Sequence, residues 1–141
     1  MNKKIKLLCL IITAILFISN AAYAAQKDVL LKTTSTWNGA KYKKLKIKNP
    51  EVTVLKIDIG VGEKLSMHKH DIVNIAYVKK GTLTVITDNN EQITIKEGEC
   101  LPELIGKYHY GQNAGKEPVE LIVFYIGEKG SPLSIDKNLK K

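Results

Sequence analysis

The chain has 141 residues, with 22 lysines, no arginine and 14 acidic residues, which give a formal charge of +8. Nucleic-acid and phosphate sites rely heavily on the planar, bidentate guanidinium group of arginine. The composition therefore argues against a nucleic-acid partner. The lysines are densest between residues 41 and 48, a pattern typical of a solvated face or of a strand edge that discourages unwanted pairing.

The first 24 residues have the pattern of a signal peptide. Lys3, Lys4 and Lys6 precede an apolar run over residues 7–18, and Ala22-Tyr23-Ala24 offers the small-x-small pattern that signal peptidase cleaves behind. The apolar run is shorter than the roughly 20 residues that span a bilayer. We therefore expect residues 1–24 to be removed on export across the inner membrane to the periplasm, with no stable membrane insertion.

Residues 25–141 are expected to form a single domain with its core at about 45–127. Loss of the three leader lysines lowers the formal charge from +8 to about +5, and it leaves Cys100 as the one remaining cysteine. A lone thiol cannot form an internal disulfide, so a hydrophobic core must stabilise the domain. We expect Cys100 to be a small buried side chain rather than a nucleophile.

Short apolar segments alternate with turn signals along almost the whole domain, which is typical of β-strands. The clearest segments lie, in chain order, at residues 52–59, 73–78, 83–86, 93–95, 108–112 and 119–126. With shorter pieces between them they suggest about eight strands and no amphipathic helix, which favours an all-β sandwich or closed barrel. We expect the lysine-rich tail after Ser131 to fray. Four aromatic residues are expected in the core or at the barrel ends: Trp37, Tyr42, Phe124 and Tyr125.

The three histidines of the chain are the candidate metal ligands. His68 and His70 are two residues apart, so both rings point to the same face of an extended strand, and Asn74 keeps the same parity. His109 lies on a separate expected strand. Neutral imidazoles that converge from two strands are typical of a site for a divalent metal. The spacing alone is equally compatible with three unrelated surface histidines.

The residues around the histidines resemble the two motifs of the cupin superfamily. The first motif reads Gly, five residues, His-x-His, three or four residues, Glu, six residues and Gly. The second reads Gly, five residues, Pro-x-Gly, two residues, His, three residues and Asn. The first motif is matched by Gly62, His68, His70 and Gly81, with Asn74 in place of Glu, and the second by Gly98, Gly106, His109 and Asn113, with Leu104 in place of Pro.

This resemblance implies a cupin-type jelly-roll β-barrel with one divalent metal per chain near its centre. The implied ligands are His68, His70 and His109, and Asn74 is either a weak ligand or a hydrogen-bonded neighbour that orients a histidine. Asn113 is expected to form hydrogen bonds within the barrel. The resemblance also implies a pocket for a small molecule at one end of the barrel and a homodimer. The motif glycines are expected to have structural roles: Gly62, Gly81, Gly98 and Gly106.

Three imidazoles leave a divalent metal with its full charge, so we expect such a site to attract an anionic or bidentate ligand. The acids nearest in sequence, Glu63, Asp71 and Glu97, offer no general base. We favour a mononuclear oxygenase that acts with Fe2+ on a small chelating metabolite. A non-catalytic cupin that holds metal or a small ligand is the alternative, followed by a metal-dependent isomerase or lyase. Imidazole ligands leave Fe2+, Zn2+, Mn2+ and Ni2+ open, and the sequence leaves open whether the protein is an enzyme.

Overall fold

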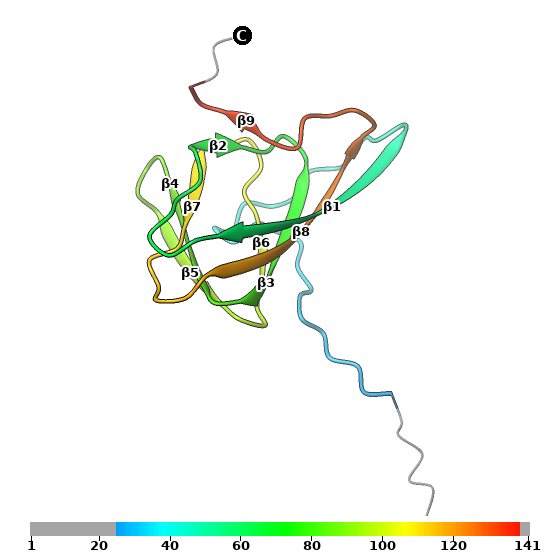
Figure 1. Cartoon of the computed structure of the whole chain (residues 1–141). Helices are drawn as coiled ribbons and strands as arrows, with labels where there is room; N and C mark the ends of the chain where they lie inside the picture. Colours follow the sequence, from blue (N-terminus) through cyan, green and yellow to red (C-terminus); the bar gives the residue numbers. More distant parts are fainter. Residues whose placement is uncertain (1–24, 139–141) are drawn as a thin grey trace, which may run out of the picture.

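The computed structural model describes residues 25–138, which form nine β-strands and no helix (Figure 1). Four strands form one sheet in the order β1-β8-β3-β6, and five form a second in the order β5-β4-β7-β2-β9. The expectation of an all-β jelly roll is confirmed. The bounds are β1 (Pro50–Ile59), β2 (His68–Lys69), β3 (Val73–Lys80), β4 (Thr82–Thr87), β5 (Gln92–Lys96), β6 (Cys100–Pro102), β7 (His109–Gln112), β8 (Val119–Glu128) and β9 (Ile135–Asp136).

The predicted signal peptide, residues 1–24, lies outside the described residues. Between residues 25 and 138, no helix has the length and apolar character needed to cross a membrane. Each of the six strands expected from the sequence is present, within a residue or two of its expected bounds at most ends. The expectation that the tail would fray is wrong for Ile135 and Asp136, because β9 pairs with β2.

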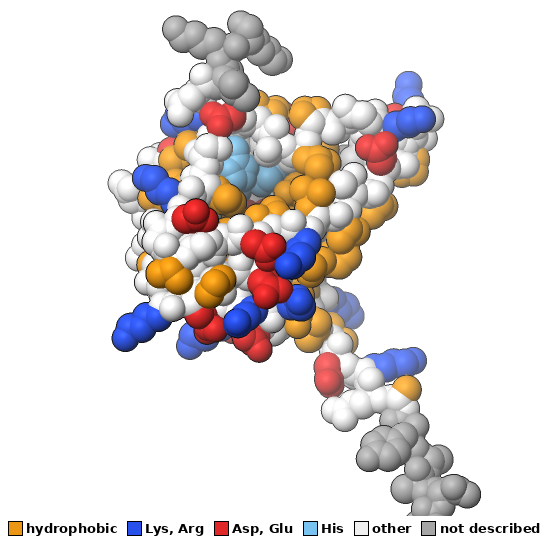
Figure 2. Space-filling view, viewed as in Figure 1, with side chains coloured by type: hydrophobic (Ala, Val, Ile, Leu, Met, Phe, Trp, Pro, Cys, Tyr) orange, Lys and Arg blue, Asp and Glu red, His pale blue; other side chains and the backbone are white. Residues whose placement is uncertain are grey.

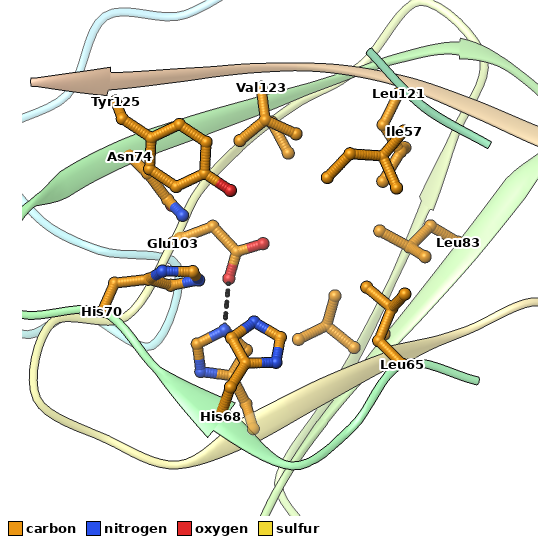
Figure 3. A pocket seen from close by; sticks show the side chains of 14 residues that line it. Ile57, Leu65, His68, His70, Asn74, Leu83, Glu103, Leu121, Val123 and Tyr125 are labelled. Carbon is orange, nitrogen blue, oxygen red and sulfur yellow. Dashed lines mark ion pairs between the residues drawn. The ribbon is translucent and has the colours of Figure 1, made fainter. Parts of the chain in front are cut away.

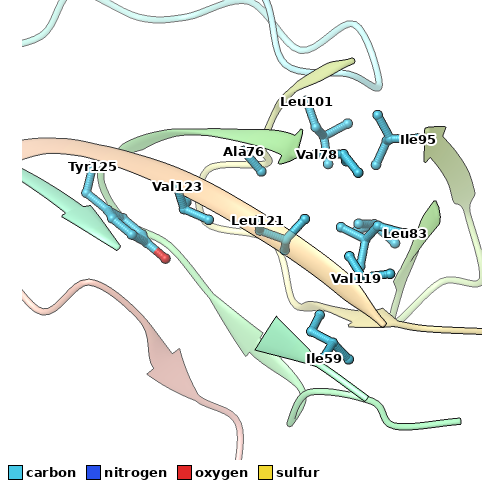
Figure 4. Close-up of a cluster of buried hydrophobic side chains, with 11 residues drawn as sticks. Ile59, Ala76, Val78, Leu83, Ile95, Leu101, Val119, Leu121, Val123 and Tyr125 are labelled. Carbon is cyan, nitrogen blue, oxygen red and sulfur yellow. The ribbon is translucent and has the colours of Figure 1, made fainter. Parts of the chain in front are cut away.

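The hydrophobic core lies between the two sheets, where alternate residues of β1, β3, β4 and β8 point inward (Figure 4). Trp37 packs against this core from the segment that precedes β1. The expectation for Phe124 is wrong, because its side chain is 42% exposed on the outer face of β8. Cys100 is half-buried, and burial raises the pKa of its thiol, which keeps it protonated and unreactive. The buried core residues are Ile59, Ala76, Val78, Leu83, Val85, Ile95, Leu101, Val119, Leu121, Val123 and Tyr125.

All four motif glycines have positive φ angles, which fits their expected role in turns. Gly81 shows the constraint most clearly. It has a φ of +82° in the turn between β3 and β4, and a Cβ atom there would lie 2.7 Å from the carbonyl oxygen of Pro118. A side chain at this position would therefore push the β3–β4 turn away from the start of β8.

Asn113 ties the end of β1 to the connection between β7 and β8. Its side chain is 1% exposed, and its amide group donates to the carbonyl oxygens of Ile59 at 3.0 Å and Glu117 at 2.8 Å. Its Oδ1 accepts a hydrogen bond from the backbone N–H of Gly115 at 3.0 Å. All the hydrogen-bonding capacity of this buried amide is thus directed at the backbone.

The variant Asn113→Ala should lower the free energy of unfolding by about 2–3 kcal/mol, because buried backbone groups lose their partners. Urea denaturation followed by circular dichroism measures this change. Asn89→Ala is the matched control, since Asn89 is exposed in the β4–β5 turn and its loss should change stability by less than about 0.5 kcal/mol. Equal stability of the two variants would contradict the role given to Asn113.

Candidate metal site

The antiparallel pairing of β2 with β7 brings the three histidines together. His68 on β2 lies directly opposite His109 on β7, and His70 follows β2 with its ring on the same side. The ring centroids of the three histidines are 4.8, 4.9 and 5.1 Å apart. His70 and His109 are buried, with exposed fractions of 3% and 1%, and His68 is half-buried.

Backbone carbonyl groups orient all three rings. Nδ1 of His68 lies 2.7 Å from the carbonyl oxygen of Ser66, Nδ1 of His70 lies 2.6 Å from that of Leu133, and Nδ1 of His109 lies 2.9 Å from that of Lys107. A carbonyl oxygen only accepts, so each Nδ1 carries the proton and donates it. Each neutral ring therefore keeps the lone pair of Nε2 for another partner, the usual arrangement of histidines that bind metals.

Burial and neighbouring charge act differently on the three imidazoles. Burial lowers the pKa of His70 to about 4 and also lowers the pKa of His68. Burial acts in the same direction on His109, but the adjacent Glu103 carboxylate and the Lys107 carbonyl group outweigh it and raise the pKa of His109. His68 and His70 are therefore neutral at neutral pH, as metal ligands must be.

Glu103 also lines the cavity, and the sequence did not single it out. It directly follows β6, its side chain is 90% buried, and its Oε2 lies 3.0 Å from Nε2 of His109 (Figure 3). Glu103 lies six residues before His109, inside the second motif. The acids considered as general bases from the sequence were others. One signal could have found it: Glu103 is the single charged residue in the run Leu101-Pro102-Glu103-Leu104, and a lone acid in an apolar run faces the interior for a reason.

Three buried polar atoms at the site have no hydrogen-bond partner among the described residues: Oε2 of Glu103, Nε2 of His109 and Oδ1 of Asn74. The glutamate oxygen lies 3.0 Å from Nε2, as in an ion pair, but the two atoms do not meet the geometry of a hydrogen bond. Unsatisfied polar atoms are rare inside proteins and call for an ion or water molecule. Their gathering beside the rings of His68 and His70 indicates a place for a cation.

The histidines line a cavity of about 40 Å³, together with Asn74, Glu103 and Tyr125. This volume holds one or two water molecules or an ion. A wider vestibule of about 400 Å³ opens outside it and shares His68, His70 and Tyr125 as walls. Figure 2 shows the histidine rings at the bottom of this hollow. Asn113 and the motif glycines do not line the cavity.

The C-terminal segment forms part of the site. Leu133 supplies the carbonyl oxygen that orients His70, and Leu133 and Ser134 line the vestibule. The backbone N–H of Lys137 donates to the carbonyl oxygen of Met67 at 2.8 Å, which holds the tail against the segment that carries His68. The residues expected to fray therefore close one side of the mouth.

The donors fit a divalent metal ion. His68, His70 and His109 offer ligand atoms that all lie within 4.8 Å of one another. Two ligands of one ion, each bonded at about 2.0–2.2 Å, lie at most about 4.4 Å apart, a separation close to this 4.8 Å limit. Imidazole nitrogens with nearby oxygen donors suit zinc, iron, manganese and nickel.

Comparisons with known proteins agree with this architecture. The family model described as "Cupin domain" matches residues 55–125, a range that contains every residue named at the cavity. The DMSP lyase DddQ from Ruegeria pomeroyi has a similar fold, with a TM-score of 0.55 and 12% identity over 64% of this chain and 45% of the lyase. This chain therefore spans less than half the length of the lyase.

Two further solved structures share the fold. The polyketide cyclase RemF from Streptomyces resistomycificus has a TM-score of 0.53 and 14% identity, over 66% of this chain and 64% of the cyclase. The protein BH2720 from Bacillus halodurans has a TM-score of 0.52 and 21% identity, over 60% and 68% of the two chains. At such identities the likeness concerns the fold alone. No curated protein matches this chain.

Replacing any one histidine, as in His68→Ala, His70→Ala or His109→Ala, should weaken zinc binding by about 100-fold or more, because each removes a ligand whose orientation is already fixed. Competition with a chromophoric chelator measures the affinity. Lys107→Ala is the matched control, because it removes an exposed side chain and keeps the carbonyl group that orients His109. A histidine variant that binds zinc as tightly as this control would exclude that residue from the site.

Proposed function

Because this chain belongs to the cupin family, we propose that it is a mononuclear metal protein that acts on a small chelating molecule at the mouth of its jelly roll. The observation that carries the proposal is the convergence of three imidazoles, two buried and one half-buried, whose Nδ1 atoms all donate to backbone carbonyl groups. Nε2 of every ring is thereby available for a metal, with Glu103 beside that of His109, and all three rings line one cavity.

A divalent ion held by His68, His70 and His109 would supply Lewis acidity or redox chemistry that the side chains lack. The chain's own residues orient the ligand and exclude water. Tyr125 reaches into the same cavity, with its ring centroid 5.7 Å from that of His70. Burial, with the negative charge of Glu103, raises the pKa of its phenol, so Tyr125 keeps its proton and can donate a hydrogen bond to an oxygen atom of a bound molecule.

The shape of the mouth favours a small molecule with a chelating head and an apolar body. One side of the vestibule is apolar, formed by Leu55, Ile57, Leu65 and Leu133. The histidines and Tyr125 lie beside it, and Ser66, Ser134 and Asp136 add polar groups at the mouth. The inner cavity of about 40 Å³ is the place of the ion itself, so a metabolite would reach the metal from the vestibule. This arrangement fits the oxygenase hypothesis, in which a metabolite binds at an open position of the metal, and it fits the binding alternative equally.

The structure also strengthens the isomerase or lyase alternative. The acids near the motifs offer no carboxylate base for that class, whereas Glu103 places a carboxylate beside His109. Solved structures of similar fold include a protein described as a DMSP lyase and one described as a sugar phosphate isomerase from a cupin superfamily. A non-catalytic metal carrier is the remaining alternative.

Elemental analysis of the protein purified from its own compartment should find about one divalent metal per chain, and His68→Ala should retain almost none. Iron, with oxygen consumption in the presence of a small chelating metabolite, would support the oxygenase. Zinc without turnover would support the binding protein. The absence of any metal from both preparations would contradict the proposed function altogether.

We also propose that the protein forms a homodimer through the outer face of the four-stranded sheet. Val52, Val54, Phe124 and Ile126 are exposed there by 63%, 51%, 42% and 39%, and the β1–β8 register sets Val52 beside Ile126 and Val54 beside Phe124. Within residues 25–138, β1 pairs only with β8. Strand β1 is therefore at the edge of the sheet. A two-fold axis next to β1 would bring the same four side chains of two copies together, as an isologous interface requires.

Light scattering after size-exclusion chromatography should give the mass of a dimer for the native protein and of a monomer for the double variant Val54→Lys/Phe124→Lys. The added charges would lie in the apolar interface. Val61→Lys is the control, because Val61 is equally exposed, at 55%, in the turn after β1 and away from this face. A native protein that stays monomeric at every concentration would overturn the proposed dimer.

A further inference from the structure

We propose that Glu103 is the fourth ligand of the metal and supplies the carboxylate that the first motif lacks at Asn74. This inference rests on the proposed function, because it requires a metal at the three histidines. It goes beyond the motifs, since neither places a ligand at position 103.

The backbone sets residues 74 and 103 side by side. Strand β6 pairs antiparallel with β3, with Pro102 opposite Ile75, and the N–H of Glu103 donates to the carbonyl oxygen of Asn74 at 3.2 Å. Both side chains point into the cavity that the histidines line (Figure 3). A carboxylate at 103 therefore reaches the same space as a carboxylate at 74, from the neighbouring strand.

The surroundings of Glu103 call for a cation. Its carboxylate is 90% buried, and within residues 25–138 its one ion-pair contact is with His109. A buried carboxylate is stable only when it is paired or bound to a metal. A protonated His109 forms an ion pair with it at 3.0 Å, but neither Oε2 nor Nε2 has a partner with hydrogen-bond geometry among the described residues, so a cation that binds both atoms can take the place of this proton.

The 3.0 Å between Oε2 and Nε2 suits two neighbouring ligands of one ion. With bonds of about 2.0–2.2 Å, ligands at right angles lie about 3 Å apart. Two ligand atoms that are this close without forming a hydrogen bond to each other can both bind one metal ion. Asn74 keeps its Oδ1 on the same cavity and then acts as a polar neighbour of the ligands.

A glutamate ligand changes the charge of the site. Three neutral imidazoles leave a divalent ion at +2, whereas three imidazoles and one carboxylate leave it at +1. The site would then hold its metal more firmly and attract anions less strongly than a three-histidine site. With Glu103 bound, the anionic or bidentate ligand expected from the sequence would be held more by chelation than by charge.

Titration of the metal-free protein with Co2+ tests this assignment, with the dissociation constant and the visible absorption spectrum as readouts. Glu103→Gln has nearly the same shape as the native residue and removes only the charge. We expect it to lose about 10- to 100-fold in affinity and to change the cobalt spectrum as the oxygen ligand is lost. Glu97→Gln is the control, because it removes an equal charge from an exposed turn and should bind within about threefold of the native protein.

The outcomes separate the inference from the proposed function. If native protein binds cobalt, His109→Ala does not, and Glu103→Gln matches the native affinity and spectrum, then Glu103 is not a ligand and only this inference fails. A glutamate that acts solely as a base would give that result, together with lost turnover. If the native protein itself binds no metal, the proposed function fails first. Thermal unfolding of the metal-free variants checks that each is folded.

A second variant tests whether the carboxylate can be moved between the two strands. Asn74→Glu/Glu103→Gln returns the acid to the position of the first motif and keeps the charge of the site unchanged. We expect it to recover cobalt affinity to within about tenfold of the native protein. If affinity stays at the level of Glu103→Gln, positions 74 and 103 are not equivalent, and the replacement of one carboxylate by the other is overturned.

Discussion

The register between β2 and β7 is the constraint on which the site depends. His68 lies opposite His109 in that pairing, and His70 shares its face because it is two residues further on. A slip of β2 by one residue relative to β7 would turn His68 and His70 away from His109, to the opposite face of the sheet. Strand β2 has only two residues, so its own hydrogen bonds hold it weakly. The C-terminal strand β9 pairs with its other edge and fixes the register from the second side.

The polar cluster sits at the end of an otherwise apolar interior, and its residues are unequally satisfied. Backbone carbonyl groups accept from Nδ1 of every histidine, whereas Nε2 of His109 and Oε2 of Glu103 have no hydrogen-bond partner among the described residues. A sequence selected for stability alone would place apolar side chains here, as it does on the other walls of the same cavity at Leu83, Leu121 and Val123. Buried polar residues that lower the stability of the fold, and that form no compensating contacts, are typical of a functional site.

The strands and the histidine cluster could be predicted from the sequence because both follow local rules. Alternation identified six strands, and the His-x-His spacing put two rings on one face. The remaining features depend on contacts between distant segments: Leu133 orients His70 across 63 residues, and the two-residue strand β9 leaves no periodic signal. Phe124 was placed wrongly because the residues from Leu121 to Ile126 are apolar on both faces, and Glu120 is the one charged residue of the expected strand that marks the outer face.

Glu103 illustrates a further limit of reading a motif as linear spacing. The departure at Asn74 suggested a site without a carboxylate, yet residues 74 and 103 are joined by a backbone hydrogen bond across β3 and the end of β6. A two-layered β-fold offers several backbone positions from which one side chain can reach the same point. The chemistry of the site is therefore set by which groups arrive at the cavity, and not by the strand that carries them. The loss of an acid from one strand indicates a changed site only if no residue on the neighbouring strands supplies an acid to the same cavity.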